Sequence, residues 1–245
     1  MRRVLIKTAS VTIYSYPVML YLGLTLGLLA QYYAADRIQL NPTRTIVATL
    51  VLLVPTLIGA RLLFVLAHWS IYRRNPQRIW RSAEGGLAMY GGLILAVLLS
   101  IPLLAILEIP WGAFWDVASF TTLIAILVAR VGCFLNGCCC GRPTSSRFAF
   151  YLPDQHGVWR RRIPTQLLEA AWTLIVLIGA ISIWKFLTAP GALFLYTLGA
   201  YGAGRFAIEF MLQEQDFVFG LPFSQILSLV LLIVSLMGLA TASWQ

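Results

Sequence analysis

The sequence predicts an all-α polytopic membrane protein, with about seven transmembrane helices around a polar cavity. Of its 245 residues, 60% are hydrophobic and only 11% are charged, whereas soluble domains carry about a quarter charged residues. The mean hydropathy is +0.82. The apolar runs follow one another without an insert long enough to form a soluble domain. We therefore expect a single integral membrane domain over residues 1–245.

The helices are predicted from apolar runs of about 20 residues, the length that crosses a bilayer. In chain order the candidate spans are 10–34, 44–69, 86–107, 114–136, 165–187, 190–214 and 223–243. The first run is longer than the apolar part of a typical signal peptide, so we expect it to be retained as a helix. The connection 137–164 contains RFAFYL, which indicates a short strand and hence a small loop subdomain between helices four and five.

Polar residues inside or beside these spans fall at particular helix ends. If successive helices alternate in direction, all of these ends belong to the same half of the membrane. This indicates one polar cavity that opens to one face, whereas the opposite ends carry only charges at loop positions, Asp116 among them. The converging residues are Tyr16, Arg61, Tyr90, Arg130, Asn136, Gln166, Glu169, Arg205, Glu209 and Gln225.

Three of these residues are arginines at membrane depth, where an unpaired charge is costly. Arg61, Arg130 and Arg205 could snorkel to headgroups or pair with carboxylates as structural elements. Arg205 and Glu209 are spaced i, i+4, so they could form such a pair. Three arginines facing one cavity favour an anionic ligand, because a guanidinium matches phosphate oxygens in a bidentate way. The net charge is +9. We expect its binding partner to be anionic lipid headgroups rather than nucleic acid, because no nucleic-acid-binding signature is visible.

The four cysteines, Cys133, Cys138, Cys139 and Cys140, lie within eight positions of one another. A structural metal site usually needs paired Cys-x-x-Cys or Cys/His sets. A disulfide from Cys133 to one of the other three is an alternative in an oxidising compartment, and small residues packed beneath the loop are another. We favour packing or a disulfide, and we expect no metal and no cofactor. His156, in the long loop, is an outside candidate for a base.

The stretch ARVGCFLNGCCCGRPT resembles the signature of the prolipoprotein diacylglyceryl transferase family. Six further blocks resemble family segments in the right order: TIYSYPVMLYLG, IGARLLFVL, EGGLAMYGGLI, RIPTQLLEA, YGAGRFAIEF and GLPFSQILS. The resemblance implies a transferase of the bacterial cytoplasmic (inner) membrane. It would move a diacylglyceryl group from phosphatidylglycerol to the lipobox cysteine of a lipoprotein precursor, forming a thioether and releasing glycerol phosphate.

The resemblance also implies residue roles. Arg130 and Arg205 would handle the phosphate, and Tyr90 stands where a histidine proposed as the base is found in well-described members. A phenol, with a pKa near 10, is a poor base at neutral pH unless a nearby arginine lowers that pKa. The substrate-binding candidates are Tyr16, Arg61, Asn136, Gly141, Gln166, Glu209 and Gln225.

The sequence departs from the family pattern on the acceptor side. Cys138 replaces a common glutamate, Cys133 often corresponds to asparagine, and Leu212 stands where an arginine is usual. Two alternatives therefore stay open: a paralogue with the same donor and another acceptor, and a non-catalytic phospholipid-binding protein.

Arginines and lysines cluster on the cavity side, which the positive-inside rule assigns to the cytoplasm. The resemblance implies that the cavity faces the outer side, and we follow it.

Overall fold

The structure is a computed structural model that describes residues 4–8, 12–73, 76–80, 88–153, 157–213, 217–218 and 221–242. It groups the chain into two compact units. The larger comprises Met1–Ala34 and Trp115–Gln245, and the smaller comprises Ala35–Phe114.

The chain is predominantly helical, as predicted. The part of the chain that the structure describes holds seven long helices, in order α1 Ser15–Arg37, α2 Pro42–Ala67, α4 Met89–Ile106, α5 Trp111–Asn136, α6 Thr165–Ile183, α7 Ala192–Glu209 and α8 Phe223–Ala242. The short helical segments are α3 Trp69–Tyr72, η1 Pro76–Trp80 and η3 Trp184–Phe186. Antiparallel hairpins join β1 Val4–Lys7 to β2 Thr12–Tyr14, β3 Phe150–Pro153 to β4 Trp159–Arg162, and β5 Phe217–Val218 to β6 Leu221–Pro222.

Within the described residues, six helices are long and apolar enough to cross a membrane: α1, α2, α4, α5, α8 and the segment that combines α6 with η3. The chain is thus a multi-pass membrane protein. The seventh long helix, α7, has 18 residues but includes Arg205 and Glu209, which lower its hydropathy. It packs against both α6 and α8.

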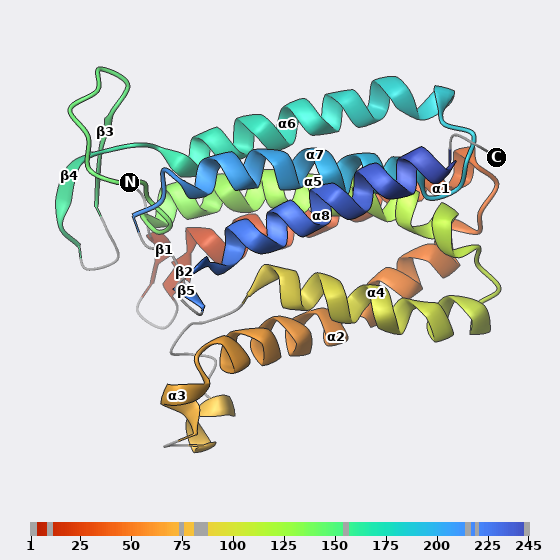
Figure 1. Cartoon of the computed structure of the whole chain (residues 1–245), viewed down its shortest axis with the longest axis horizontal. Coiled ribbons are helices and arrows are strands. Elements are labelled where there is room, and N and C mark those ends of the chain that lie inside the picture. Colours follow the sequence, from red (N-terminus) through yellow and green to blue (C-terminus); the bar gives the residue numbers. More distant parts are fainter. Residues whose placement is uncertain are drawn as a thin grey trace. The chain divides into compact units, whose positions relative to one another are not determined.

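Most predicted spans match the observed helices to within a few residues, but the first one was wrong at its start. Residues 12–14 form β2, and α1 begins only at Ser15. The predicted loop subdomain is confirmed, because the β3–β4 hairpin connects α5 to α6 and pairs Phe150 with Arg162. In Figure 1 this hairpin lies beside the C-terminal end of α5 and the N-terminal end of α6.

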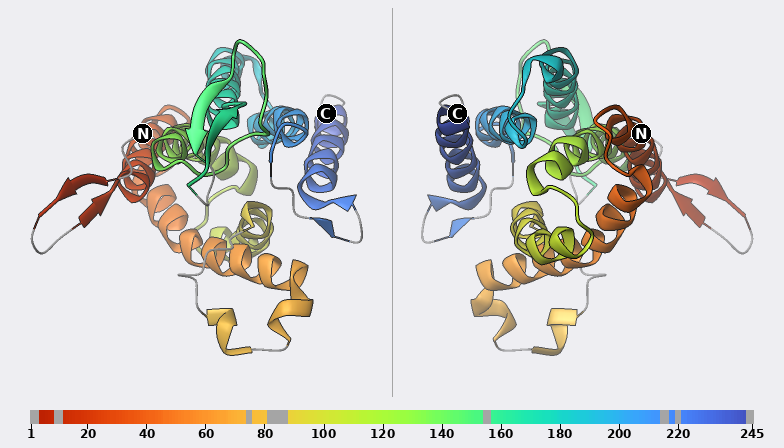
Figure 2. Two further views of the ribbon diagram at one scale, coloured as in Figure 1. Left: turned by 90° about the vertical axis from the view of Figure 1, so that its left-hand side faces the viewer. Right: turned by 90° about the vertical axis from the view of Figure 1, so that its right-hand side faces the viewer.

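The helices of the larger unit run side by side (Figures 1 and 2), and small residues let them approach closely. A Cβ atom added to Gly27 of α1 would lie 2.8 Å from the Thr121 backbone of α5. The Thr121 hydroxyl has two acceptors within reach of its one hydrogen, Gln31 Oε1 at 2.7 Å and the Gly27 carbonyl at 2.9 Å. Close packing through small residues is typical of helix pairs in membranes.

Asp116 was counted among the charges at loop positions, although the predicted span 114–136 contains it, and the loop position was wrong. It lies in the first turns of α5 and is buried. Its carboxylate accepts hydrogen bonds from the Gly191 amide at 2.7 Å and the Phe194 amide at 2.9 Å. Asp116 therefore caps the start of α7 from another helix, which satisfies amides that have no partner within their own helix. Its burial depends on this partner, which lies 75 residues away along the chain.

The smaller unit is built on the α2–α4 pair. A Cβ atom added to Gly59 would collide with the carbonyl oxygen of Gly91, and one added to Gly91 would collide with that of Gly59. Just before α4, the Ala88 amide donates to the Ala60 carbonyl of α2 at 2.9 Å. These contacts bring the end of α2 and the start of α4 together.

Candidate active site

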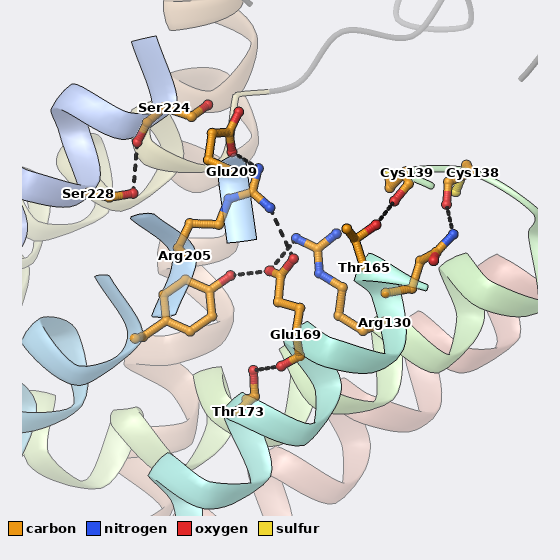
Figure 3. Close-up of polar contacts among 12 residues, drawn as sticks. Arg130, Cys138, Cys139, Thr165, Glu169, Thr173, Arg205, Glu209, Ser224 and Ser228 are labelled. Atoms are coloured by element: carbon orange, nitrogen blue, oxygen red, sulfur yellow. Dashed lines mark hydrogen bonds and ion pairs between the residues drawn. The ribbon is translucent and has the colours of Figure 1, made fainter. Parts of the chain in front are cut away.

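A buried carboxylate of α6, Glu169, is the centre of the polar network in the larger unit (Figure 3). Its Oε1 lies 2.7 Å from Arg130 Nη2 of α5 and accepts a hydrogen bond of 2.6 Å from the Tyr201 hydroxyl of α7. Its Oε2 lies 3.0 Å from Arg205 Nη1, also of α7. One glutamate thus joins three helices and both arginines predicted to handle phosphate.

Arg205 has a second acidic partner. Its Nη2 lies 2.7 Å from Glu209 Oε2, so the i, i+4 pair considered from the sequence forms. Two arginines therefore face two glutamates, and their formal charges balance. Such pairing is what a low-dielectric environment requires, because a buried charge without a partner is expensive.

The two arginines differ in how many of their hydrogen-bond donors are already used. A guanidinium carries five N–H donors. Arg205 uses both terminal nitrogens on carboxylates, whereas Arg130 contacts Glu169 through Nη2 alone. Among the described residues, no protein group pairs with Arg130 Nε or Nη1, and 18% of its side chain is exposed. Arg130 is thus held in place by Glu169 and still has donors for an anionic ligand.

The turn after α5 is fastened to the first turn of α6. The chain reverses at Gly137, whose φ of 77° suits a residue without a Cβ atom. The Gln166 side-chain amide then donates to the Cys138 carbonyl at 2.6 Å, and the Thr165 hydroxyl donates to the Cys139 carbonyl at 2.8 Å. Gln166, predicted to bind substrate, therefore holds the backbone of the signature stretch.

Gly141 connects the same stretch to the end of α7. Its amide donates to the Ile163 carbonyl at 3.0 Å. A Cβ atom at this position would lie 2.7 Å from that carbonyl oxygen and 2.9 Å from the Met211 oxygen. Only a glycine fits there without movement of the backbone, which makes Gly141 a residue that shapes the site.

The cysteines are also brought together. The Sγ atoms of Cys133, Cys138 and Cys139 all lie within 4.8 Å of one another, and all four cysteines are free thiols. The disulfide considered from the sequence is thus not formed in this structure. Hydrogen bonds from the Cys133 and Cys139 thiols, together with the nearby charge of Arg130, hold the pKa of the Cys138 thiol below its usual range.

The remaining candidates are distributed over both units. Tyr16 lies in the first turn of α1 beside Gly132, close enough to Arg130 to interact with it electrostatically. Asn136 ends α5 and hydrogen-bonds Cys138, while Gln225 is buried near the start of α8.

Arg61 and Tyr90 belong to the smaller unit. Arg61 Nε donates to the Ile79 carbonyl at 2.9 Å, and its guanidinium lies 5.5 Å from the centre of the Tyr72 ring. Tyr90 is buried in α4. Their roles stay predictions, and His156 lies outside the described residues.

Sequence reasoning missed the importance of two residues. Glu169 was placed among the converging residues but received no role, and Tyr201, which lies one helix turn before Arg205 on the same face, was not among them. The available signal was the acid itself, because a glutamate in an apolar span needs cationic or hydrogen-bonding partners.

Comparison with known proteins bears on this site. The family model described as prolipoprotein diacylglyceryl transferase matches residues 3–241. A protein of Trichormus variabilis is 27% identical over 248 residues, which cover 97% of this chain and 88% of the relative. Proteins of Clostridium botulinum strains Hall and 657 are 28% and 29% identical over 226 residues, about 90% of each chain. All three are named phosphatidylglycerol–prolipoprotein diacylglyceryl transferase.

Proposed function

The chain belongs to the prolipoprotein diacylglyceryl transferase family, and we propose that it transfers a diacylglyceryl group from phosphatidylglycerol to the lipobox cysteine of a lipoprotein precursor. The observation that carries this proposal is the arginine pair held by one buried glutamate in a multi-pass membrane protein. The names of relatives that cover about 90% of the chain support the same donor and acceptor.

In the proposed reaction the acceptor thiolate attacks the glyceryl carbon that is bonded to the phosphate oxygen. A sulfur–carbon bond forms, the carbon–oxygen bond breaks, and the electron pair leaves with the phosphate as glycerol phosphate. The thiol proton is lost to a base or to solvent. Negative charge therefore grows on the phosphate oxygens in the transition state, where fixed donors stabilise it most.

Arg130 is the principal phosphate ligand in this scheme, because its Nε and Nη1 have no other partner among the described residues. Arg205 supplies positive charge beside it and is positioned by two carboxylates. Glu169 fixes both guanidinium groups in advance, so that little reorganisation is needed when charge develops.

The other site residues are proposed in supporting roles. Tyr90 is the proposed base or thiol-orienting residue. The residues proposed to bind or shape the substrate site are Tyr16, Arg61, Asn136, Gly141, Gln166, Glu209 and Gln225. No metal and no cofactor are needed for this chemistry. The proposed location is the bacterial inner membrane, with the cavity facing its outer side and the bilayer supplying phosphatidylglycerol.

Complementation tests the proposal. A conditional bacterial strain depleted of its own diacylglyceryl transferase would receive this chain, with Arg130→Ala as the control. Rescue by the wild type alone is the expected result. Absence of rescue by an inserted, stable protein would contradict the proposal. In that case, release of glycerol phosphate without lipidation of a lipobox peptide would indicate another acceptor, and no turnover would indicate a phospholipid-binding protein.

A further inference from the structure

The proposed transfer reaction does not use the three clustered cysteines. Cys133 lies in the last turn of α5, and Cys138 and Cys139 follow in the turn after it. Their Sγ atoms all lie within 4.8 Å of one another. The relevant feature is that three sulfurs, and not two, point to one place.

This spacing suits a shared metal ion. Zinc–thiolate bonds are about 2.3 Å long, so three thiolates around one ion lie roughly 4 Å apart. The observed cluster therefore needs only small side-chain movements to close around an ion. A disulfide would join two of the sulfurs at about 2 Å and leave the third beside it without a role.

The backbone around the cluster is arranged for this convergence. Cys139 has a φ of 58°, a left-handed conformation that few residues other than glycine adopt. The amides of Gly137 and Cys138 both donate to the Cys133 carbonyl, at 2.9 and 3.2 Å, which folds the turn back onto the last turn of α5. An unusual conformation held by the surrounding structure is a reason to look for function.

The charges nearby are also compatible with a bound ion. The cluster lies at the C-terminal end of α5, where the helix dipole favours a cation. Three thiolates with a monovalent or divalent cation carry net negative charge, and Arg130 interacts electrostatically with all three cysteines. Cys139 is exposed and offers an entry path, whereas Cys133 is buried.

We propose that Cys133, Cys138 and Cys139 form a trithiolate site for a thiophilic d¹⁰ metal ion, Zn²⁺ or Cu⁺. Soft thiolate ligands select these ions. Each thiol that binds releases one proton to solvent. The argument for this site does not rest on the proposed transferase activity.

The test uses the purified full-length protein in detergent, reduced and freed of metal. Zn²⁺ in one experiment and Cu⁺ in another would be partitioned between the protein and a chromophoric chelator, and X-ray absorption would count the sulfur ligands. We expect one ion per chain with three sulfur ligands. Cys139→Ser should weaken binding by about tenfold or more, because one of three ligands is lost. Cys140→Ser is the matched control and should bind as the wild type does.

Several results would overturn the proposal. One is the absence of binding by the reduced wild type for both ions, and another is an X-ray absorption spectrum without three sulfurs. Equal weakening by Cys140→Ser and Cys139→Ser would also contradict it. Mass spectrometry after thiol alkylation checks the remaining alternative, since a disulfide among these cysteines in freshly isolated protein would assign the cluster to redox chemistry. If Cys139→Ser does not fold, Cys138→Ser replaces it. The number of sulfur ligands in the X-ray absorption spectrum of the wild type tests the proposal without any variant.

Discussion

Replacing Arg130 with lysine tests the proposed phosphate contact most specifically. Lysine keeps the positive charge but replaces the planar guanidinium fork with a single ammonium group. In the structure, Glu169 Oε1 lies 2.7 Å from Arg130 Nη2, so the ammonium of the variant would remain with this carboxylate. The N–H groups on Nε and Nη1 would then be lost from the site.

The expected loss follows from those missing donors. Removing one donor that stabilises transition-state charge typically lowers kcat by about 10²–10³, or about 2.7–4 kcal/mol. Because the phosphate gains charge mainly in the transition state, we expect kcat to fall by roughly this factor and KM to change much less.

The assay is the release of glycerol phosphate from phosphatidylglycerol in the presence of a lipobox peptide. Arg44→Lys is the matched control, because the Arg44 side chain is 54% exposed and its contact with Glu108 is a loose one of 3.7 Å. Thermal unfolding in detergent checks that both variants are folded. If Arg130→Lys kept its kcat within about threefold of the wild-type value, the assignment of Arg130 to the phosphate would be wrong.

Three further variants test the packing and electrostatics of the fold. Glu169→Gln removes the charge shared by two arginines and should lower the free energy of unfolding by about 3–5 kcal/mol; an unchanged unfolding midpoint in detergent would count against a structural role for that charge. Gly59→Ala places a methyl group against the Gly91 carbonyl and should cost about 1–3 kcal/mol, measured in the same way; no loss would mean that α2 and α4 can separate freely. Asp116→Asn leaves one of two α7 amides without its acceptor and should lower the free energy of unfolding by about 1–3 kcal/mol. Hydrogen exchange at the Gly191 and Phe194 amides should accelerate, and unchanged protection would contradict the capping role.

The helices could be predicted because membrane spans are set by length and hydropathy, which are properties of each segment alone. The first helix was misplaced at its start because the apolar residues of β2 continue directly into α1. The Arg205–Glu209 pair was also within reach of the sequence, since residues four apart share a helix face.

The contacts between helices could not be predicted in the same way. Arg130 and Glu169 are 39 positions apart, and nothing in the spacing states that they meet. The cysteine cluster depends on the left-handed backbone at Cys139, for which cysteine has no intrinsic preference. Asp116 was misjudged for a related reason, because its burial depends on amides at the start of α7.

The central claim is the transfer of a diacylglyceryl group to a cysteine thiol, and mass spectrometry tests it most directly. The purified protein would be incubated with isotopically labelled phosphatidylglycerol and a lipobox peptide. A peptide that gains one labelled diacylglyceryl group through a thioether, with one glycerol phosphate released for each peptide, is the predicted result. An unmodified peptide, with folded protein and intact phosphatidylglycerol, would contradict it.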